Sequence, residues 1–309
     1  MSVAAIVGGV VLLALASGRF VEGAAGLSLR FRVSKVLIGA LVIGFGTSLP
    51  ELLVSGLAAL EDAPGIAVGN VVGSNVANLT LILGAVALLA APVVHSGILN
   101  REVPITIGAM GLYGWSLTTG SRLAGLVLLG AFGLATAVLV RVARRDDARL
   151  AAEVEEATAP ARARTPLLLV AETVGGLVGT LIGAQLVVIG AKGLATSLGI
   201  SEGFVGFTIV AVGTSLPELV TAIAAARRDE AELAVGNVFG SNLFNSLVIG
   251  GTVALLAPPA GLGRFGVAVL VMVATGLLVA VLIARGLRLS RLDGIALVVV
   301  YGVTVITVL

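Results

Sequence analysis

Two copies of one heptapeptide carry the residues of this chain that are best suited to chemistry. The sequence Gly-Thr-Ser-Leu-Pro-Glu-Leu begins at Gly46 and again at Gly213. Pro50 and Pro217 have no N–H, so each proline leaves a helical carbonyl one turn earlier without its usual partner. In a membrane such a carbonyl needs another partner, and a bound cation can serve as one. Carboxylate, hydroxyl and carbonyl oxygens are the ligands of hard cations such as Ca²⁺, so each motif predicts part of a cation site.

The spacing of the polar residues brings their oxygens together. Thr47 and Ser48 precede Glu51 by four and three residues, so their oxygens can share one side of a helix. Ser74 and Asn78 are also four residues apart. The second copy supplies Thr214, Ser215, Glu218, Ser241 and Asn245. Brought together, these side chains would form a cage of mostly neutral oxygens with two carboxylates.

The repetition extends beyond the heptapeptide. An offset of 167 residues carries Gly46 onto Gly213, and it also carries Asn78 onto Asn245. The segments between them follow without a gap: Val68-Gly69-Asn70-Val71 matches Val235-Gly236-Asn237-Val238, and Gly73-Ser74-Asn75 matches Gly240-Ser241-Asn242. The chain is therefore expected to consist of two structural repeats.

The composition places both repeats in a membrane. Of the 309 residues, 58% are hydrophobic and 12% are charged, whereas soluble domains average about 25% charged residues. Cysteine is absent and there is one histidine, which excludes thiolate metal sites and cysteine nucleophiles. With no aspartate pair at mid-membrane either, we do not expect an enzyme.

The hydrophobic pattern predicts an all-α integral membrane protein with ten transmembrane helices. Because each half has five spans, an odd number, the halves would form two inverted-topology repeats. We expect a first repeat at 1–142, a polar linker at 143–166 and a second repeat at 167–309. The first part of the linker is expected to extend the fifth helix. The predicted spans are 2–18, 35–60, 66–90, 102–119, 123–142, 167–190, 202–226, 232–256, 265–284 and 292–309.

The basic residues predict an orientation for these spans. With the N-terminus outside, 16 of the 19 Lys and Arg residues fall in inner loops, which agrees with the positive-inside rule. Only Arg122, Lys192 and Arg264 fall outside. We therefore expect a multi-pass cell-membrane protein with both termini outside and the linker between the fifth and sixth spans in the cytoplasm.

Several of these residues also have a purely structural interpretation. A single intramembrane glutamate can be a protonated packing group, and Ser48 or Ser215 can bond back to its own helix. Two glutamates at equivalent positions instead favour a functional role for both, because placing a charge at mid-membrane costs roughly 2.5–3.5 kcal/mol. Asn70 and Asn237 are more readily read as structural links. Gly175, Gly179 and Gly183 form a small-residue stripe for close helix packing, or else a smooth face for sliding.

The two motifs, followed by GNVVGSNVANL and GNVFGSNLFNSL, closely resemble the paired repeats of the sodium/calcium exchanger family in its prokaryotic ten-helix form. The resemblance covers the whole chain. It implies an eight-helix core and two long tilted helices, the first and the sixth, that slide across it. The implied activity is exchange of Ca²⁺ for Na⁺ by alternating access.

The resemblance also implies a set of cation ligands. Glu51 and Glu218, with the carbonyls of Thr47 and Thr214, would hold Ca²⁺, and sodium sites would flank that position. One residue departs from the family pattern, because Asn245 stands where an aspartate is usual. The remaining implied ligands are Ser48, Ser74, Asn78, Ser215, Ser241 and the carbonyl of Ala211, which Gly44 mirrors in the first half.

Two other transport functions stay open. The Asn245 departure makes a Ca²⁺/H⁺ or other cation/H⁺ antiporter a real alternative, with Glu51 and Glu218 as proton carriers. A channel is disfavoured because the site lies between two halves of one chain. We expect no cofactor, since Ca²⁺ and Na⁺ would be substrates. The expected partners are inorganic cations and the lipid bilayer, with no nucleic acid and no obligatory protein partner.

Overall fold

The protein is almost entirely helical. The computed structural model describes residues 2–31, 38–61, 64–157, 164–197, 214–258 and 265–308. Within these residues the only strand-like pairing is an isolated antiparallel bridge between Val93 and Arg288. Six helices are long and apolar enough to cross a membrane, and a bent pair of helices would make a seventh span. The predicted all-α membrane class is therefore confirmed.

The described part of the chain is divided into a series of helices. They are α1 (Ser2–Phe31), the π-helix η1 (Gly39–Gly44), α3 (Phe45–Thr47), α4 (Leu49–Leu60), α5 (Pro64–Ala77), the π-helix η2 (Asn78–Ile82), α6 (Leu83–Ala90), α7 (Ser96–Asn100), α8 (Glu102–Thr119), α9 (Arg122–Ala157), α10 (Pro166–Ser197), α13 (Leu216–Ala226), α14 (Ala231–Phe244), the π-helix η5 (Asn245–Ile249), α15 (Gly250–Leu256), α16 (Gly266–Ala284) and α17 (Arg291–Val308).

These helices cover the described part of every predicted span. The predicted span 35–60 corresponds to the bent pair, with 48° between Gly39–Thr47 and Leu49–Leu60. The predicted span 202–226 is described only from residue 214 onward. Ten membrane crossings therefore stay a prediction. The fifth helix continues as α9 to Ala157, well into the predicted polar linker.

Local structure repeats at the same offset as the sequence. Adding 167 to the bounds of α5 and η2 gives the bounds of α14 and η5. The heptapeptides match as well, because the backbone leaves helical geometry at both Ser48 and Ser215 before the next helix begins. Equivalent residues of the two halves therefore occupy equivalent positions in their helices.

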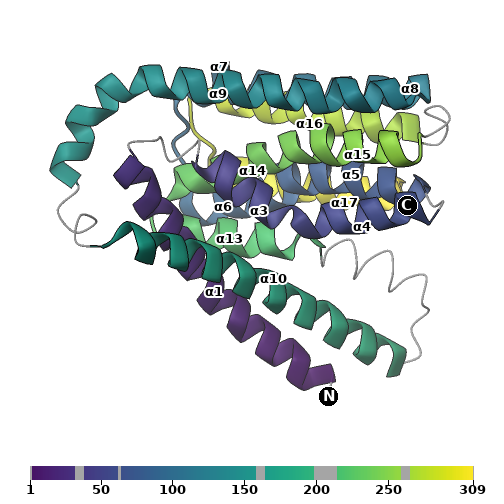
Figure 1. Ribbon diagram of the computed structural model, residues 1–309, viewed down its shortest axis with the longest axis horizontal. Coiled ribbons are helices and arrows are strands. Elements are labelled where there is room, and N and C mark those ends of the chain that lie inside the picture. Colours follow the sequence, from purple (N-terminus) through teal and green to yellow (C-terminus); the bar gives the residue numbers. More distant parts are fainter. Residues whose placement is uncertain are drawn as a thin grey trace.

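Each half begins with a long helix, α1 in the first half and α10 in the second. These two helices pack closely against each other. They lie obliquely along one side of the other helices, with α8, α9 and α16 on the opposite side in this view (Figure 1). Both α1 and α10 also contact α13. This pair corresponds to the two long helices that the family resemblance places outside the core.

Glycines of α10 permit this close packing, but the predicted stripe was partly wrong. A Cβ on Gly183 would lie 2.9 Å from the Leu13 backbone nitrogen, and one on Gly179 would lie 2.7 Å from the Ala16 Cβ. A Cβ on Gly175 would have no neighbour within 4 Å. The glycines therefore fit α10 against α1, which favours close packing of this pair over a smooth face turned to the core.

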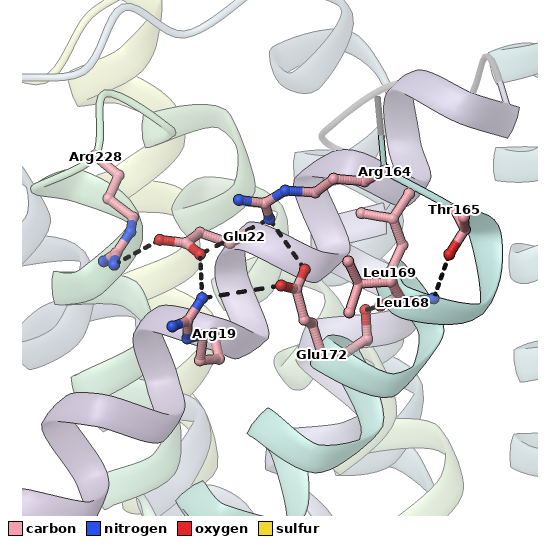
Figure 2. A network of polar contacts seen from close by, with 9 residues as sticks. Arg19, Glu22, Arg164, Thr165, Leu168, Leu169, Glu172 and Arg228 are labelled. Atoms are coloured by element: carbon pink, nitrogen blue, oxygen red, sulfur yellow. Dashed lines mark hydrogen bonds and ion pairs between the residues drawn. The ribbon is translucent and has the colours of Figure 1, made fainter. Parts of the chain in front are cut away.

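An ionic network joins α1, α10 and the end of α13 (Figure 2). Glu172 of α10 accepts from Arg164 at 3.0 Å and lies 3.9 Å from Arg19 of α1. Glu22 of α1 pairs with Arg228, in the turn after α13, at 3.0 Å. The first contacts tie α1 to α10, whereas the Glu22–Arg228 pair ties α1 to the rest of the helices.

Candidate functional site

The two intramembrane glutamates sit in equivalent first turns. Glu51 lies in the first turn of α4 and Glu218 in the first turn of α13, each directly after the proline of its heptapeptide. Both side chains are 1% exposed. The N–H groups at a helix start carry partial positive charge, which favours a carboxylate there. Each break in the helix therefore provides a place where a buried carboxylate is tolerated.

Each glutamate is held by a serine of the other half. Ser48 Oγ donates to Glu218 Oε1 at 2.9 Å, and Ser215 Oγ donates to Glu51 Oε1 at 3.1 Å. Thr214 also lies beside the Glu51 carboxylate. The two heptapeptides thus meet so that the serine of each one bonds the glutamate of the other. Together with Thr214 and Thr47, these four residues form one buried cluster of predicted ligands.

One oxygen of each carboxylate has no hydrogen-bond partner among the described residues. These atoms are Glu51 Oε2 and Glu218 Oε2, and both are inaccessible to solvent. A buried polar atom without a partner is uncommon and costly. A bound cation is one way to supply a partner to each atom.

Polar contacts between the halves continue from Thr47 and Gly44. Thr47 Oγ1 donates to the Ile43 carbonyl at 3.0 Å and lies 3.3 Å from Asn237 Oδ1. Ser241 Oγ donates to the Gly44 carbonyl at 3.0 Å. The Gly44 carbonyl, which the family resemblance names as a mirror ligand, is therefore already joined to a predicted ligand of the second half.

The remaining predicted ligands lie on the neighbouring helices. Ser74, Asn78 and Asn245 are 5%, 1% and 0% exposed. The π-helix η2, which begins at Asn78, packs against α13, and η5, which begins at Asn245, packs against α4. Each asparagine therefore lies on an element that contacts the glutamate helix of the other half. Ala211 lies outside the described residues.

Three further asparagines of the same motifs lie beside the site or bond to one of its residues. Asn237 donates to the Glu218 carbonyl at 3.4 Å, and Asn70 donates to the Glu51 carbonyl at 3.3 Å, so both are links as expected but lie beside the site. Asn242 was not selected, yet its Oδ1 accepts from Asn78 Nδ2 at 2.9 Å. Its presence in both Gly-Ser-Asn copies was the available signal.

The arrangement suits a hard cation. It offers two carboxylates, several hydroxyls and amide oxygens, and carbonyls near helix breaks, all of them oxygen donors. Within the described ranges, no group of three or more His, Cys, Asp or Glu side chains could hold a metal ion. The two glutamates supply the carboxylates of the described site, and the hydroxyls bonded to them are neutral donors.

A buried, oxygen-lined site between broken helices of two repeats, in an all-helical membrane protein, defines a membrane ion transporter. The sodium/calcium exchanger protein family model matches residues 1–141 and 168–309. The chain belongs to this family.

Relatives along the full length agree with this assignment. A putative antiporter, CaxA of Alkalimonas amylolytica, is 35% identical over 95% of this chain and 94% of its own length. The sodium/calcium exchanger MaX1 of Methanosarcina acetivorans is 30% identical, with the same coverage of both chains. The solved structure of the sodium-calcium exchanger NCX_Mj soaked with Na⁺ and Ca²⁺ matches with a TM-score of 0.86 and 31% identity, over 99% of this chain and 98% of that one.

Proposed function

We propose that this protein exchanges Ca²⁺ for Na⁺ across the membrane by alternating access at the site between its halves. The observation that carries the proposal is the pair of glutamates, each bonded to a serine of the other half. Glu51 and Glu218 each have one buried oxygen without a partner among the described residues. A divalent ion in a low-dielectric site needs compensating negative charge, and two carboxylates supply it. The names of the full-length relatives point to the same ions.

The proposed ligands are the residues selected from the two motifs. We assign Ca²⁺ to the two glutamates and the heptapeptide carbonyls, and Na⁺ to flanking positions. The hydroxyls and amides serve both ions, since each is a neutral oxygen donor suited to a monovalent cation as well. The full proposed set is Thr47, Ser48, Glu51, Ser74, Asn78, Ala211, Thr214, Ser215, Glu218, Ser241 and Asn245.

Alternating access would be carried by movement of α1 and α10 across the other helices. Support comes from the packing, because glycines fit these two helices closely to each other. The Glu22–Arg228 ion pair joins the pair of helices to the α13–α14 turn, and such exposed pairs contribute only about 0–1 kcal/mol. Motion of α1 and α10 as a unit would therefore break few strong contacts.

We further propose that both termini face the outside and that the linker faces the cytoplasm. Three basic residues from separate predicted inner loops support this orientation, because Arg19, Arg164 and Arg228 meet in one network (Figure 2). The C-terminus lies at the opposite end of the helices from the last residues of α9 and the first residues of α10 (Figure 1). We propose no cofactor and no obligatory protein partner.

The decisive experiment is Ca²⁺ uptake into proteoliposomes loaded with Na⁺, compared with vesicles without a Na⁺ gradient. Uptake that requires the outward Na⁺ gradient is the expected result. Uptake driven equally by a proton gradient without Na⁺ would replace Na⁺ with H⁺ as the counter-ion. Uptake that needs neither gradient and does not saturate would indicate a channel and would overturn the antiport proposal.

A further inference from the structure

Four buried asparagines form two repeat-equivalent pairs beside the site. Asn75 and Asn78 of the first half become Asn242 and Asn245 at the offset of 167 residues. All four side chains are at most 1% exposed. Asparagine is polar at both ends of its amide, so four of them in a buried region of a membrane protein must find partners or remain costly.

One cross-half pair is bonded and its mirror image is not. Asn78 Nδ2 donates to Asn242 Oδ1 at 2.9 Å. The equivalent bond would run from Asn245 Nδ2 to Asn75 Oδ1. Instead, Asn245 Nδ2, Asn245 Oδ1 and Asn75 Oδ1 are all buried without a partner in the described parts of the chain, and Asn75 Nδ2 donates to the Val71 carbonyl of its own helix at 2.9 Å.

The elements that carry both pairs are nevertheless packed together. The helix α14, which holds Asn242, contacts η2, which begins at Asn78. In the same way α5, which holds Asn75, contacts η5, which begins at Asn245. The asymmetry therefore lies in the side chains and their local geometry rather than in a missing contact between elements.

Two inverted repeats can exchange conformations when the site changes the side to which it opens. A bond present in only one of the repeats then belongs to one of the two states. We propose that Asn242 positions the Asn78 side chain in the state described here, and that Asn75 takes up Asn245 in the oppositely facing state, so that the two asparagine bonds alternate. This inference rests on the proposed alternating-access function but not on the identity of the ions.

The pairs would then also set the ligand geometry. While Asn78 donates to Asn242, its own Oδ1 has no partner in the described residues, which leaves that oxygen available to a cation. Asn245, without a bond, is not oriented in this way. Each state would therefore present one oriented and one unoriented asparagine to the ions.

The state populations can be measured through the ion pair between α1 and the α13–α14 turn. The chain has no cysteine, so Glu22→Cys with Arg228→Cys introduces a single thiol pair where the native side chains lie 3.0 Å apart. A bifunctional thiol reagent then traps this state, and after a fixed exposure too short to consume most of the protein, the ratio of cross-linked to uncross-linked protein follows the population of the state. The reporter responds to conformation and needs no transported ion.

Asn242→Ala should lower this ratio about fivefold, which is the effect expected for one net hydrogen bond present in only one state. Asn245→Ala should change the ratio in the opposite direction, because it removes the bond of the other state, whereas in this state the Asn245 side chain has no partner among the described residues. The double variant should return close to the native ratio. Equal or same-direction effects of the two single variants would overturn the proposal, as would an unchanged ratio in Asn242→Ala.

Two further variants guard against a merely structural effect. Asn242→Gln keeps an uncharged amide oxygen as an acceptor for Asn78 and should keep the ratio closer to native than Asn242→Ala does. Asn100→Ala, at an exposed asparagine at the end of α7, should have no effect. If native vesicles show no Na⁺-dependent Ca²⁺ uptake while the ratios shift oppositely, the ion assignment fails and the asparagine inference stands. If uptake is normal and the ratios do not shift, only the inference fails.

Discussion

Ser48 of the first half donates a 2.9 Å hydrogen bond to Glu218 of the second half, so a carboxylate and the hydroxyl that holds it come from opposite ends of the sequence. Ser215 and Glu51 repeat the relationship in the other direction at 3.1 Å. Neither half can therefore build a complete site alone, and any separation of the halves changes both carboxylates together.

The two glutamates should be equally necessary for transport. We expect Glu51→Gln and Glu218→Gln each to lower Ca²⁺ uptake about 100-fold or more, because an uncompensated buried charge costs about 3–5 kcal/mol. The measurement is initial uptake in proteoliposomes at matched protein content. Glu61→Gln, at the exposed end of α4, is the control and should transport normally. Near-native uptake by either site variant would remove the central claim.

The serines that bond the glutamates of the opposite half should tune affinity rather than folding. Ser48→Ala and Ser215→Ala each leave a glutamate oxygen unbonded, and a hydrogen bond to a charged group contributes about 1.5–3 kcal/mol. We expect the KM for Ca²⁺ to change at least about tenfold in both variants, by similar factors. Ser116→Ala, which removes a hydroxyl that donates to the Tyr113 carbonyl of its own helix α8, should leave KM unchanged. A large effect from one serine alone would contradict the paired arrangement.

The glycines of α10 give a matched pair of stability variants. Gly183→Ala should destabilise the protein by about 1–3 kcal/mol, the usual cost of an added methyl group in a tight contact, because backbone atoms of α1 lie within 3.0 Å of the new Cβ. Gly175→Ala, eight residues earlier on α10, should not destabilise it. Thermal unfolding in detergent compares the two. Equal midpoints would mean that α1 and α10 are not packed as described.

The orientation can be tested with thiols, because the native chain has no cysteine. Ala157→Cys, at the end of α9, should resist an impermeant thiol reagent applied to intact cells. Arg122→Cys, at the opposite end of the same helix, should react. The reverse pattern would invert the topology, and labelling of both positions would show that α9 does not span the membrane.

The number of carboxylates bears on stoichiometry. Two ionised glutamates carry a charge of about −2, which one Ca²⁺ or two monovalent ions would neutralise, whereas a third Na⁺ would bring an uncompensated charge into a dry site. We therefore expect close to two monovalent ions per Ca²⁺, measured as the potential at which Ca²⁺ flux reverses against a Na⁺ gradient. A reversal potential for three Na⁺ would contradict this. Asn245→Asp should make exchange more voltage-dependent.

Much of the fold could be predicted because the signals were strong and doubled. Long apolar stretches predicted the helices, and the proline of each heptapeptide predicted the break that the structure has at Ser48 and at Ser215. The shared buried cluster also followed from the repeated motifs. The helices and their breaks depend on local properties of the chain, namely the length of apolar stretches and the position of proline, which the sequence shows directly.

The pairing within the site could not be predicted in the same way. Spacing places Ser48 on the same helical face as Glu51, but its hydroxyl bonds Glu218, because the two breaks meet face to face. Likewise the glycine stripe was shifted to Gly176, Gly179 and Gly183, since only the neighbouring helix decides which face is crowded. Such choices depend on tertiary packing, which periodicity within one helix does not contain.

The π-helical segments η2 and η5 have a mechanical consequence. Each begins at the asparagine of its repeat and joins two α-helical stretches without interrupting them. A π turn holds one residue more than an α turn, so returning a segment to α geometry would rotate one flank against the other by about 100°, the angle of a single residue. Asn78 and Asn245 therefore lie where a change of helix type can rotate a ligand toward or away from an ion while the helix stays continuous.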